Sequence, residues 1–169
     1  MKTIYFIRHA KSDWSNTGLT DFDRPLNLRG YTDAHKMSLS MKEQAIFPEL
    51  IITSPAIRAI STAMIFAENL DFNFSKITIN KKLYASTVNE YVDCVKKINN
   101  QINTAFLFGH NPSISDCVNS FTTAFTGELS TCAMVGLEFK VEDWENISSK
   151  NGSFSYYNYP KKLIKKENS

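Results

Sequence analysis

The 169-residue sequence lacks the features that mark several classes of protein. Its longest apolar runs, such as residues 104–108, are far too short to span a bilayer, so we expect no membrane association. The net charge of +2 is nearly balanced, and the composition gives no indication of nucleic-acid binding. No signal-peptide cleavage pattern precedes the first apolar run, which predicts a cytoplasmic protein.

Cysteine and histidine are scarce, with three residues of each, and neither type shows the spacing of a local metal site. Cys-x-x-Cys and His-x-x-x-His are both absent, so we expect reduced, buried thiols and neither metal nor any other cofactor. The alternative is a metal site assembled in space from His9, His110 and an aspartate.

Apolar runs typical of buried strands alternate with helical patterns along the chain. The predicted strands are 3–8, 50–53, 76–80, 104–108, 133–140 and 153–158, and the predicted helices are 28–44, 55–70, 88–102 and 112–125. This alternation indicates an α/β fold, a three-layer α/β/α sandwich with a mainly parallel sheet covered on both faces. The length favours a single domain, and covered sheet edges favour a monomer. The basic residues near the end of the chain are interpreted as a solvated tail, with a docking surface for an acidic partner as the alternative.

Polar residues follow three of the predicted strands. Arg8 and His9 come after the first strand, Ser54 after the second, and His110 after the strand at 104–108. Ligands of open parallel sheets bind outside the carboxyl ends of the strands, so these residues are expected to share one pocket. The loop at 10–27, directly after the first strand, is long enough to favour a functional role.

The same strand ends also indicate an anion site. Ser54-Pro55 and Asn111-Pro112 resemble helix starts, with a capping residue before proline, and free N–H groups at helix starts favour anions. Arg58 is predicted in the first turn of its helix, where its planar donors match phosphate oxygens. Each motif alone is common in purely structural roles, but their joint occurrence predicts a phosphoryl site with a histidine nucleophile.

These motifs together resemble the signature of the histidine phosphatase superfamily, whose members include phosphoglycerate mutases and many phosphatases. The resemblance is carried by Arg8-His9, residues 54–59 (SPAIRA) and residues 109–112 (GHNP). Residues 8–12, residues 23–26 with Arg29-Gly30, and residues 159–161 resemble the small SixA-like phosphohistidine phosphatases. The resemblance covers nearly the whole chain. It implies a phosphoglycerate mutase-like fold and a single histidine phosphatase domain over residues 1–169.

The resemblance also implies roles for the strand-end residues. His9 is the expected nucleophile, forming a covalent phosphohistidine that water then hydrolyses. Arg8, Arg58 and His110 are the expected phosphate-binding groups that stabilise the charge on the transferred group. His9 must attack as a neutral imidazole, so a backbone carbonyl is expected to hold the proton on its other nitrogen.

The general acid is the part of the pattern that this sequence does not match. Larger relatives carry a glutamate soon after the segment corresponding to Leu83-Tyr84, but here Ala85-Ser86-Thr87 follows. The candidates are Glu90, predicted inside the next helix, and three aspartates of the long loop: Asp13, Asp21 and Asp23. A weak or missing acid favours phosphoramidate substrates, because imidazole leaves more easily than an alkoxide.

Three functions are compatible with these residues. The first is a metal-independent phosphatase with a phosphohistidine intermediate, acting on phosphohistidine in proteins or on a small phosphoester. The second is a phosphotransferase or mutase on small phosphoesters, which uses the same nucleophile but needs a guarded site. The third is a phosphate-recognition module without turnover, which would tolerate the loss of either His9 or His110.

Overall fold

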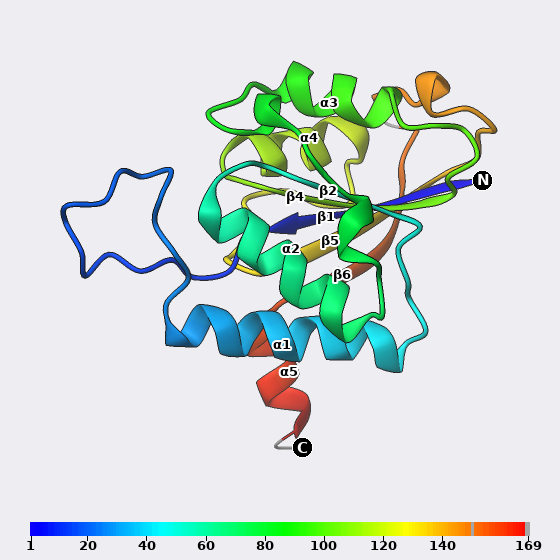
Figure 1. The fold of residues 1–169 in the computed structure, drawn as a ribbon. Coiled ribbons are helices and arrows are strands. Elements are labelled where there is room, and N and C mark those ends of the chain that lie inside the picture. Colours follow the sequence, from blue (N-terminus) through cyan, green and yellow to red (C-terminus); the bar gives the residue numbers. More distant parts are fainter. Residues whose placement is uncertain (150, 168–169) are drawn as a thin grey trace.

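The computed structural model describes residues 1–149 and 151–167, and these form a layered α/β fold (Figure 1). Within this part of the chain, six strands make one sheet in the order β3-β2-β4-β1-β5-β6. β5 runs antiparallel to β1 and β6, and the other neighbouring strands are parallel, which confirms the predicted mainly parallel sheet. The strands are β1 (Lys2–Arg8), β2 (Leu50–Thr53), β3 (Ile77–Ile79), β4 (Thr104–Gly109), β5 (Met134–Phe139) and β6 (Ser153–Asn158).

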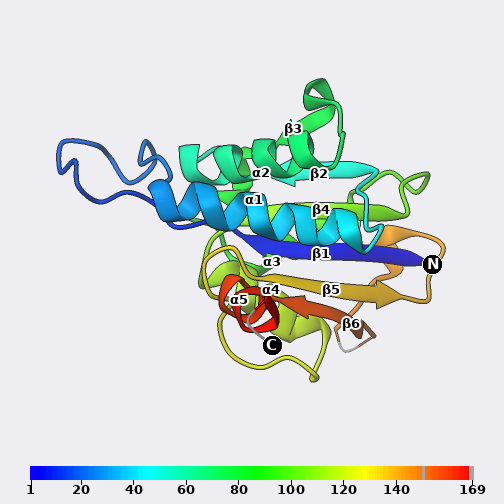
Figure 2. The ribbon, with the colours of Figure 1, turned by 90° about the horizontal axis from the view of Figure 1, so that it is seen from below.

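Helices cover both faces of this sheet, as predicted. α1 and α2 lie against one face and α3 and α4 against the other, while α5 lies beside α1 (Figures 1 and 2). The helices are α1 (Leu28–Glu43), α2 (Ile57–Asn69), α3 (Val88–Lys96), α4 (Ser113–Phe121) and α5 (Pro160–Glu167). Single 3₁₀ turns lie at Phe74–Lys76, Lys81–Leu83 and Trp144–Asn146. No helix among the described residues is long and apolar enough to cross a membrane.

Two apolar clusters hold the layers together, one on each face of the sheet. Side chains of β1 alternate between them, because successive residues of a strand point to opposite faces. Ile4 and Phe6 belong to the cluster under α3 and α4, whereas Tyr5 and Ile7 belong to the cluster under α1 and α2. Ile4, Phe6 and Ile7 are fully buried, so the strand that carries Arg8 and His9 runs through the centre of the core.

Two helices end earlier than their apolar patterns predict. The patterns indicate helices over 88–102 and 112–125, but α3 ends at Lys96 and α4 ends at Phe121. After α3, the side chain of Asn99 accepts a hydrogen bond from the Gln101 N–H. After α4, the hydroxyl of Thr122 accepts one from the Ala124 N–H. Such local side-chain bonds compete with the helical ladder, and periodicity alone does not show them.

The predicted capping residues of α2 and α4 are wrong. α2 begins at Ile57 after Ala56, and α4 begins at Ser113 after Pro112, and neither helix has a side-chain cap. The side chains of Ser54 and Asn111 lie before these starts and bond to other groups, Ser54 to His110 and Asn111 to Ser115 and Leu129. Ser54 Oγ also accepts a hydrogen bond from the N–H of Ala56 at 3.4 Å, directly before α2, but neither side chain is the cap of its helix.

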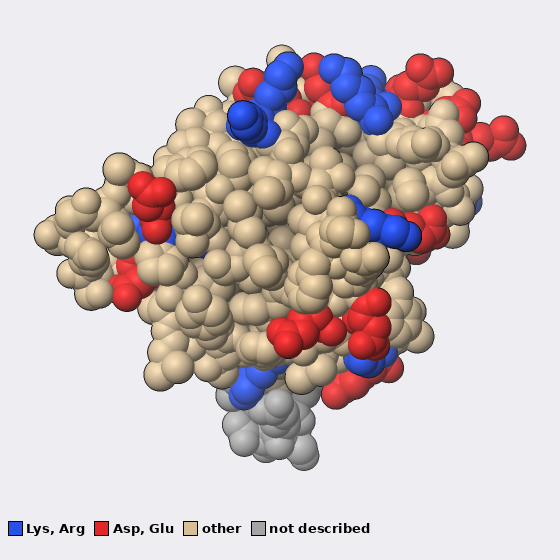
Figure 3. Space-filling model, viewed as in Figure 1, with Lys and Arg blue, Asp and Glu red and all other residues tan. Residues whose placement is uncertain are grey.

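The basic segment at the end of the chain forms α5 rather than a simple solvated tail. Pro160 opens this helix, a position at which its fixed φ angle and missing N–H are tolerated. Lys162 donates a hydrogen bond from Nζ to the Tyr157 carbonyl at 2.8 Å, and Lys161 is exposed. Over the face seen in Figure 3, basic and acidic side chains are interspersed, which agrees with the nearly balanced net charge.

Gly30 allows α1 to approach the loop that follows His9. A Cβ atom at this position would lie 2.1 Å from the carbonyl oxygen of Lys11, which is a backbone atom and cannot rotate away. The same carbonyl accepts a hydrogen bond from the Asn27 N–H, directly before α1. This close contact fixes the backbone two residues beyond His9.

Replacing Gly30 by alanine should therefore destabilise the protein. Helix propensity alone favours alanine over glycine by up to about 1 kcal/mol, whereas the backbone clash should lower the free energy of unfolding by about 1–3 kcal/mol. Urea denaturation of Gly30→Ala measures the sign. Gly18→Ala in the exposed part of the loop, where the nearest atom is 3.3 Å away, is the control. A stabilised Gly30→Ala variant would contradict the close approach.

Candidate active site

The carboxyl ends of β1, β2 and β4 meet at one edge of the sheet. β4 pairs in parallel with both other strands, and backbone hydrogen bonds continue past their ends. The His9 N–H donates to the Gly109 carbonyl at 3.1 Å, and the Ser54 N–H donates to the Phe108 carbonyl at 3.1 Å. The rings of His9 and His110 consequently lie side by side, with their centroids 5.0 Å apart.

His9 is almost completely buried and is held by one hydrogen bond. Only 8% of the residue is exposed, and Nδ1 lies 2.7 Å from the carbonyl oxygen of Ala10. A carbonyl can only accept, so Nδ1 carries the proton of the neutral ring and Nε2 carries the lone pair. Ala10 is itself fixed, because its N–H donates to Thr62 Oγ1 on α2 at 3.0 Å. Such a carbonyl was expected for a histidine that attacks through Nε2.

The surroundings of His9 keep it neutral. The pKa of the imidazole is lowered to about 4, chiefly by burial and also by the positive charges of Arg58 and Arg8, against the opposing effects of the Ala10 carbonyl and Asp21. A neutral ring near pH 7 has a free lone pair at Nε2, which a nucleophile requires.

Arg58 lies in the first turn of α2 and reaches into the same pocket. It is 8% exposed, and its guanidinium binds Asp21 twice: Nη2 donates to Oδ2 at 2.9 Å, and Nη1 donates to the main-chain carbonyl. Its main-chain carbonyl accepts a hydrogen bond from Thr62 Oγ1 at 2.7 Å. Thr62 therefore links the backbone of Arg58 to the backbone of Ala10, one residue from His9.

Arg8 is anchored on the opposite side of His9 by the loop that precedes β5. Its Nη1 donates to the Leu129 carbonyl at 2.8 Å, while its buried Nε has no hydrogen-bond partner among the described residues. The side-chain amide of Asn111 donates to the same carbonyl at 3.0 Å. The Cys132 N–H donates to the carbonyls of Arg8 and His9, which ties this loop to the end of β1.

His110 is positioned from three sides. Its main-chain N–H donates to the hydroxyl of Tyr91 at 2.9 Å, its Nε2 lies 2.7 Å from Ser54 Oγ, and Tyr84 packs against the ring edge-on. Its Nδ1 is buried and has no partner among the described residues. The pKa of His110 is lowered to about 3, chiefly by burial and also by His9 and Arg58. This ring is therefore neutral near pH 7 as well.

Of the four candidates for general acid, the structure brings only Asp21 to the pocket. Asp13 accepts from the Ser15 N–H at 2.8 Å, and Asp23 accepts from Thr20 Oγ1 at 2.6 Å, both in the exposed loop. Glu90 lies in the first turn of α3 and forms a capping box with Thr87. These three carboxylates make local structural contacts and do not line the pocket.

The carboxyl group of Asp21 is ionised near pH 7, so it has no proton to donate as a general acid. Partial burial raises the pKa of its carboxyl, but hydrogen bonds from Arg58 and Tyr84 and the charge of Arg58 outweigh this effect and lower the pKa overall. The Tyr84 hydroxyl donates to Oδ2 at 3.0 Å, beside the bond from Arg58. Tyr84 was missed by the sequence analysis as a pocket residue, although it follows Leu83 in the segment that matches larger relatives.

A cavity of about 350 Å³ lies beside Arg58, Asp21 and His110. Its lining residues come from the long loop, α2, the segment before α3 and the start of α4: Asp21, Arg58, Tyr84, Ala85, Ser86, His110, Asn111, Pro112 and Ser113. Of the four predicted site residues, Arg58 and His110 line this cavity, whereas His9 and Arg8 are not among its lining residues. His9 is next to it through the ring of His110, and the charges at its wall are those of the Arg58–Asp21 pair.

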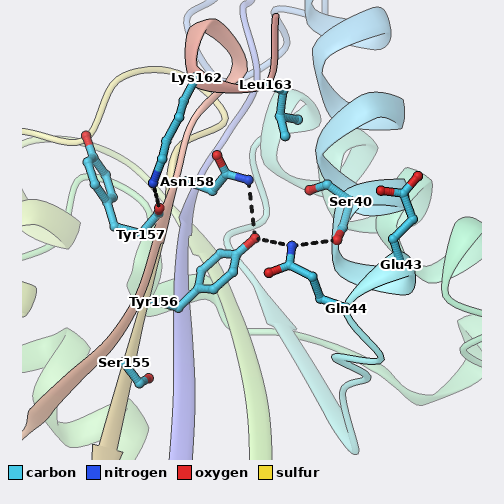
Figure 4. A pocket seen from close by; sticks show the side chains of 9 residues that line it. All are labelled: Ser40, Glu43, Gln44, Ser155, Tyr156, Tyr157, Asn158, Lys162 and Leu163. Carbon is cyan, nitrogen blue, oxygen red and sulfur yellow. Dashed lines mark hydrogen bonds between the residues drawn. The ribbon is translucent and has the colours of Figure 1, made fainter. Parts of the chain in front are cut away.

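A larger cavity of about 590 Å³ lies away from the strand-end residues, between the end of α1 and β6 (Figure 4). Tyr156 and Gln44 meet there, with the Gln44 side-chain amide 3.2 Å from the Tyr156 hydroxyl. None of the four predicted site residues lines it. The size of a cavity therefore does not mark the site in this molecule; the convergence of strand ends does.

The described residues hold no group of three or more His, Cys, Asp or Glu side chains arranged to bind a metal ion. The alternative that His9, His110 and an aspartate form such a site is therefore not realised in the described residues. Asp21 is directed to Arg58 and Tyr84, and the cationic groups of the pocket would repel a divalent cation.

Comparisons with known proteins agree with this geometry. The family model of the histidine phosphatase superfamily (branch 1) matches residues 4–102. An uncharacterized chloroplastic protein of Arabidopsis thaliana is 25% identical over 159 residues, which are 89% of this chain and 72% of that protein.

Solved structures share the whole fold. The protein histidine phosphatase SixA complexed with tungstate superimposes with a TM-score of 0.82 at 21% identity, covering 95% of this chain and 99% of that one. A putative phosphohistidine phosphatase SixA from Agrobacterium tumefaciens gives a TM-score of 0.79 at 21% identity, covering 94% and 98%. These likenesses establish a phosphoglycerate mutase-like fold along nearly the entire chain.

The buried neutral histidines should make the stability of the protein depend on pH. The folded-state pKa of His9, about 4, is below the value of about 6.5 that an exposed histidine has, so the unfolded chain binds more protons between these values. The stabilisation is fully present above pH 6.5 and is lost as the pH falls through 4. For His9 alone the loss is on the order of 3 kcal/mol.

Denaturation curves between pH 7 and pH 4 test this dependence. The free energy of unfolding should fall less steeply for His9→Asn and His110→Asn than for the unchanged protein. His35→Asn is the control, because His35 is exposed and lies outside the pocket. Parallel curves for all four proteins would show that neither histidine is held neutral by burial.

Proposed function

The chain belongs to the histidine phosphatase superfamily, and from this membership we propose that it is a phosphatase that forms a covalent phosphohistidine on His9 without a metal ion. We propose further that residues 1–169 act as one catalytic domain. The observation that carries the proposal is the bond from His9 Nδ1 to the Ala10 carbonyl, which leaves Nε2 unprotonated beside two arginines.

In the first step, His9 Nε2 attacks the phosphorus atom and the bond from phosphorus to the leaving group breaks. The leaving atom takes the bonding electron pair and acquires a proton. Arg8, Arg58 and His110 surround the transferred group and stabilise the charge on its equatorial oxygens. The Ala10 carbonyl stabilises the positive charge that His9 gains when its second nitrogen bonds to phosphorus.

In the second step, water attacks the phosphohistidine and the phosphorus–nitrogen bond breaks. The electron pair returns to Nε2, inorganic phosphate leaves, and one proton of the water goes to phosphate or solvent. The Asp21 carboxylate lies at the cavity and is ionised, but hydrogen bonds from Arg58 and Tyr84 make it a weak base, so neither step depends on it. The low pKa of His9 helps this step, because it makes the imidazole a better leaving group.

The substrate that we propose is phosphohistidine in a protein, with small phosphoesters as the wider class. Two observations support this choice. Asp21 is ionised and cannot donate a proton to a poorly leaving alkoxide, whereas phosphohistidine releases imidazole, which protonates readily from solvent. The fold also matches the SixA phosphatases over nearly the whole length of both chains, so no additional lid domain lies in the matched region.

Phosphate release from a phosphohistidine peptide in excess EDTA tests the nucleophile and the reaction class together. The unchanged protein and His35→Ala should release phosphate at the same rate, and His9→Ala should release none. Release that stops in EDTA would contradict metal independence. If the unchanged protein and His9→Ala both bind the peptide and neither releases phosphate, the protein is a recognition module instead.

Replacing Asp21 by asparagine tests whether it is a general acid. Because the carboxylate is ionised and bound to Arg58, Asp21→Asn should change kcat on the phosphohistidine peptide by less than about tenfold. It should also lower KM, since a negative charge beside the phosphate site is removed. Asp13→Asn, in the exposed loop, is the control. A fall in kcat of about 10²–10⁴ would identify Asp21 as the acid after all.

A further inference from the structure

Ser54 is a polar residue of the pocket whose role differs from the helix cap that its sequence suggests. The residue is completely buried, with 0% exposed, and its Oγ lies 2.7 Å from Nε2 of His110. Its second contact is the Ala56 N–H, which donates to Oγ at 3.4 Å. Ser54 thus lies directly between the end of β2 and the ring beside His9.

The single proton of the Ser54 hydroxyl needs an acceptor. The Ala56 N–H is a donor and cannot accept it. Among the described residues, Nε2 of His110 is then the one remaining partner of Oγ, and an imidazole nitrogen can accept. If Nε2 carried the ring proton instead, the hydroxyl proton of Ser54 and the lone pair of His110 Nδ1 would both be buried without a partner among the described residues; if Nε2 accepts, only the N–H at Nδ1 is. The proton of Ser54 therefore points to Nε2.

This direction of the hydrogen bond decides where His110 carries its own proton. A neutral imidazole has one N–H, and a nitrogen that accepts a hydrogen bond does not carry it. If Nε2 accepts from Ser54, the proton lies on Nδ1. Nδ1 is buried without a partner among the described residues, and the ring lies 5.0 Å from that of His9. A phosphoryl oxygen could accept a hydrogen bond from this unpartnered Nδ1–H.

We propose that Ser54 is a positioning residue that holds His110 in the tautomer protonated at Nδ1, so that the neutral ring presents an N–H to the phosphoryl group. The opposite tautomer would place a lone pair against the anion and repel it. The catalytic consequence rests on the proposed phosphatase function, whereas the tautomer itself does not.

The surroundings of His110 keep its imidazole neutral, and a neutral imidazole needs a partner such as Ser54 to fix which nitrogen carries the proton. The charged and titratable groups that act on the ring are His9, Arg58, Asp21 and Arg8, and burial together with the two arginines disfavours a protonated imidazole. A doubly protonated ring would offer an N–H at both nitrogens without help. A neutral ring has only one, so its placement must be set by the other nitrogen.

The two partners are also fixed in space by the backbone. The Ser54 N–H donates to the Phe108 carbonyl on β4, and the His110 N–H donates to the buried hydroxyl of Tyr91. Tyr84 packs on the ring, with centroids 5.8 Å apart. Neither partner can move away easily, so the hydrogen bond is built into the pairing of β2 with β4.

Nitrogen-15 NMR of the intact protein near pH 7, with labelled histidine, measures the tautomer directly. The unchanged protein should show His110 with a protonated Nδ1 and an unprotonated Nε2. A signal from protonated Nε2 in the unchanged protein overturns the proposal, whether or not any variant folds. Inorganic phosphate is the probe for the second part, and its addition should shift the Nδ1 resonance in particular.

Two variants separate positioning from structure. Ser54→Ala removes the donor and should let His110 populate the tautomer protonated at Nε2, with kcat reduced by about 10²-fold, because a histidine in the wrong tautomer loses its alignment with the reacting group. Thr53→Val is the matched control: Thr53 is equally buried, and its hydroxyl donates to the main-chain carbonyl of Ser54 and makes no hydrogen bond to His110 among the described residues. It should leave the tautomer and kcat unchanged.

The outcomes distinguish this inference from the proposed function. An inactive protein with the Nδ1–H tautomer would contradict the phosphatase and leave Ser54 in its positioning role. An active protein in which Ser54→Ala leaves the tautomer and kcat unchanged would contradict the role of Ser54 alone. Equal losses of kcat in Ser54→Ala and Thr53→Val would show that the effect is general destabilisation, which also contradicts it.

Discussion

The parallel pairing of β2, β4 and β1 is the constraint on which the rest of the site depends. Because the three strands are in register, their carboxyl ends stop at the same level, and each end delivers one polar residue: Ser54, His110 and His9. The backbone bonds from Ser54 to Phe108 and from His9 to Gly109 extend this register beyond the strands. Ser54 and His110, 56 residues apart in sequence, thus become hydrogen-bond partners, and the still more distant His9 and His110 become ring neighbours.

This convergence brings two arginines and two histidines into one buried volume, where protonated side chains would repel one another. Four positive charges there would repel one another strongly. The structure avoids this by keeping both imidazoles neutral and by pairing Arg58 with Asp21. Burial and the neighbouring positive charges act in the same direction on each ring. The neutrality that the proposed attack by His9 requires is therefore a consequence of the packing.

The sequence predicts the order of the elements and the strand ends well, because both depend on local apolar patterns. Residues 3–8, 50–53 and 104–108 are predicted as strands, and the structure has strands there within one residue at each end. The helix lengths are predicted less well. After α3 and α4, the side chains of Asn99 and Thr122 accept hydrogen bonds from nearby N–H groups in place of helical bonds. The spacing of apolar residues does not predict such bonds.

The parts of the site that the sequence does not predict are those that depend on contacts between distant segments. Thr62 joins α2 to Ala10, and Tyr84 joins the segment before α3 to Asp21, across 52 and 63 residues. Among four candidate carboxylates, only the fold shows that Asp21 reaches the cavity. Ser54 is the clearest case: its sequence context suggests a cap, but its buried hydroxyl is used by a ring that lies 56 residues away.

The pairing of Arg58 with Asp21 also bears on the phosphate binding that we propose. Asp21 occupies two donors of the guanidinium and is itself exposed on 52% of its side chain, whereas the side chain of Arg58 is exposed on only 9%. If Arg58 binds the phosphoryl group as proposed, that group shares the guanidinium with a carboxylate already in place, and both anions compete for the same donors. The negative charge of Asp21 then opposes binding, which is the reason that Asp21→Asn is expected to lower KM.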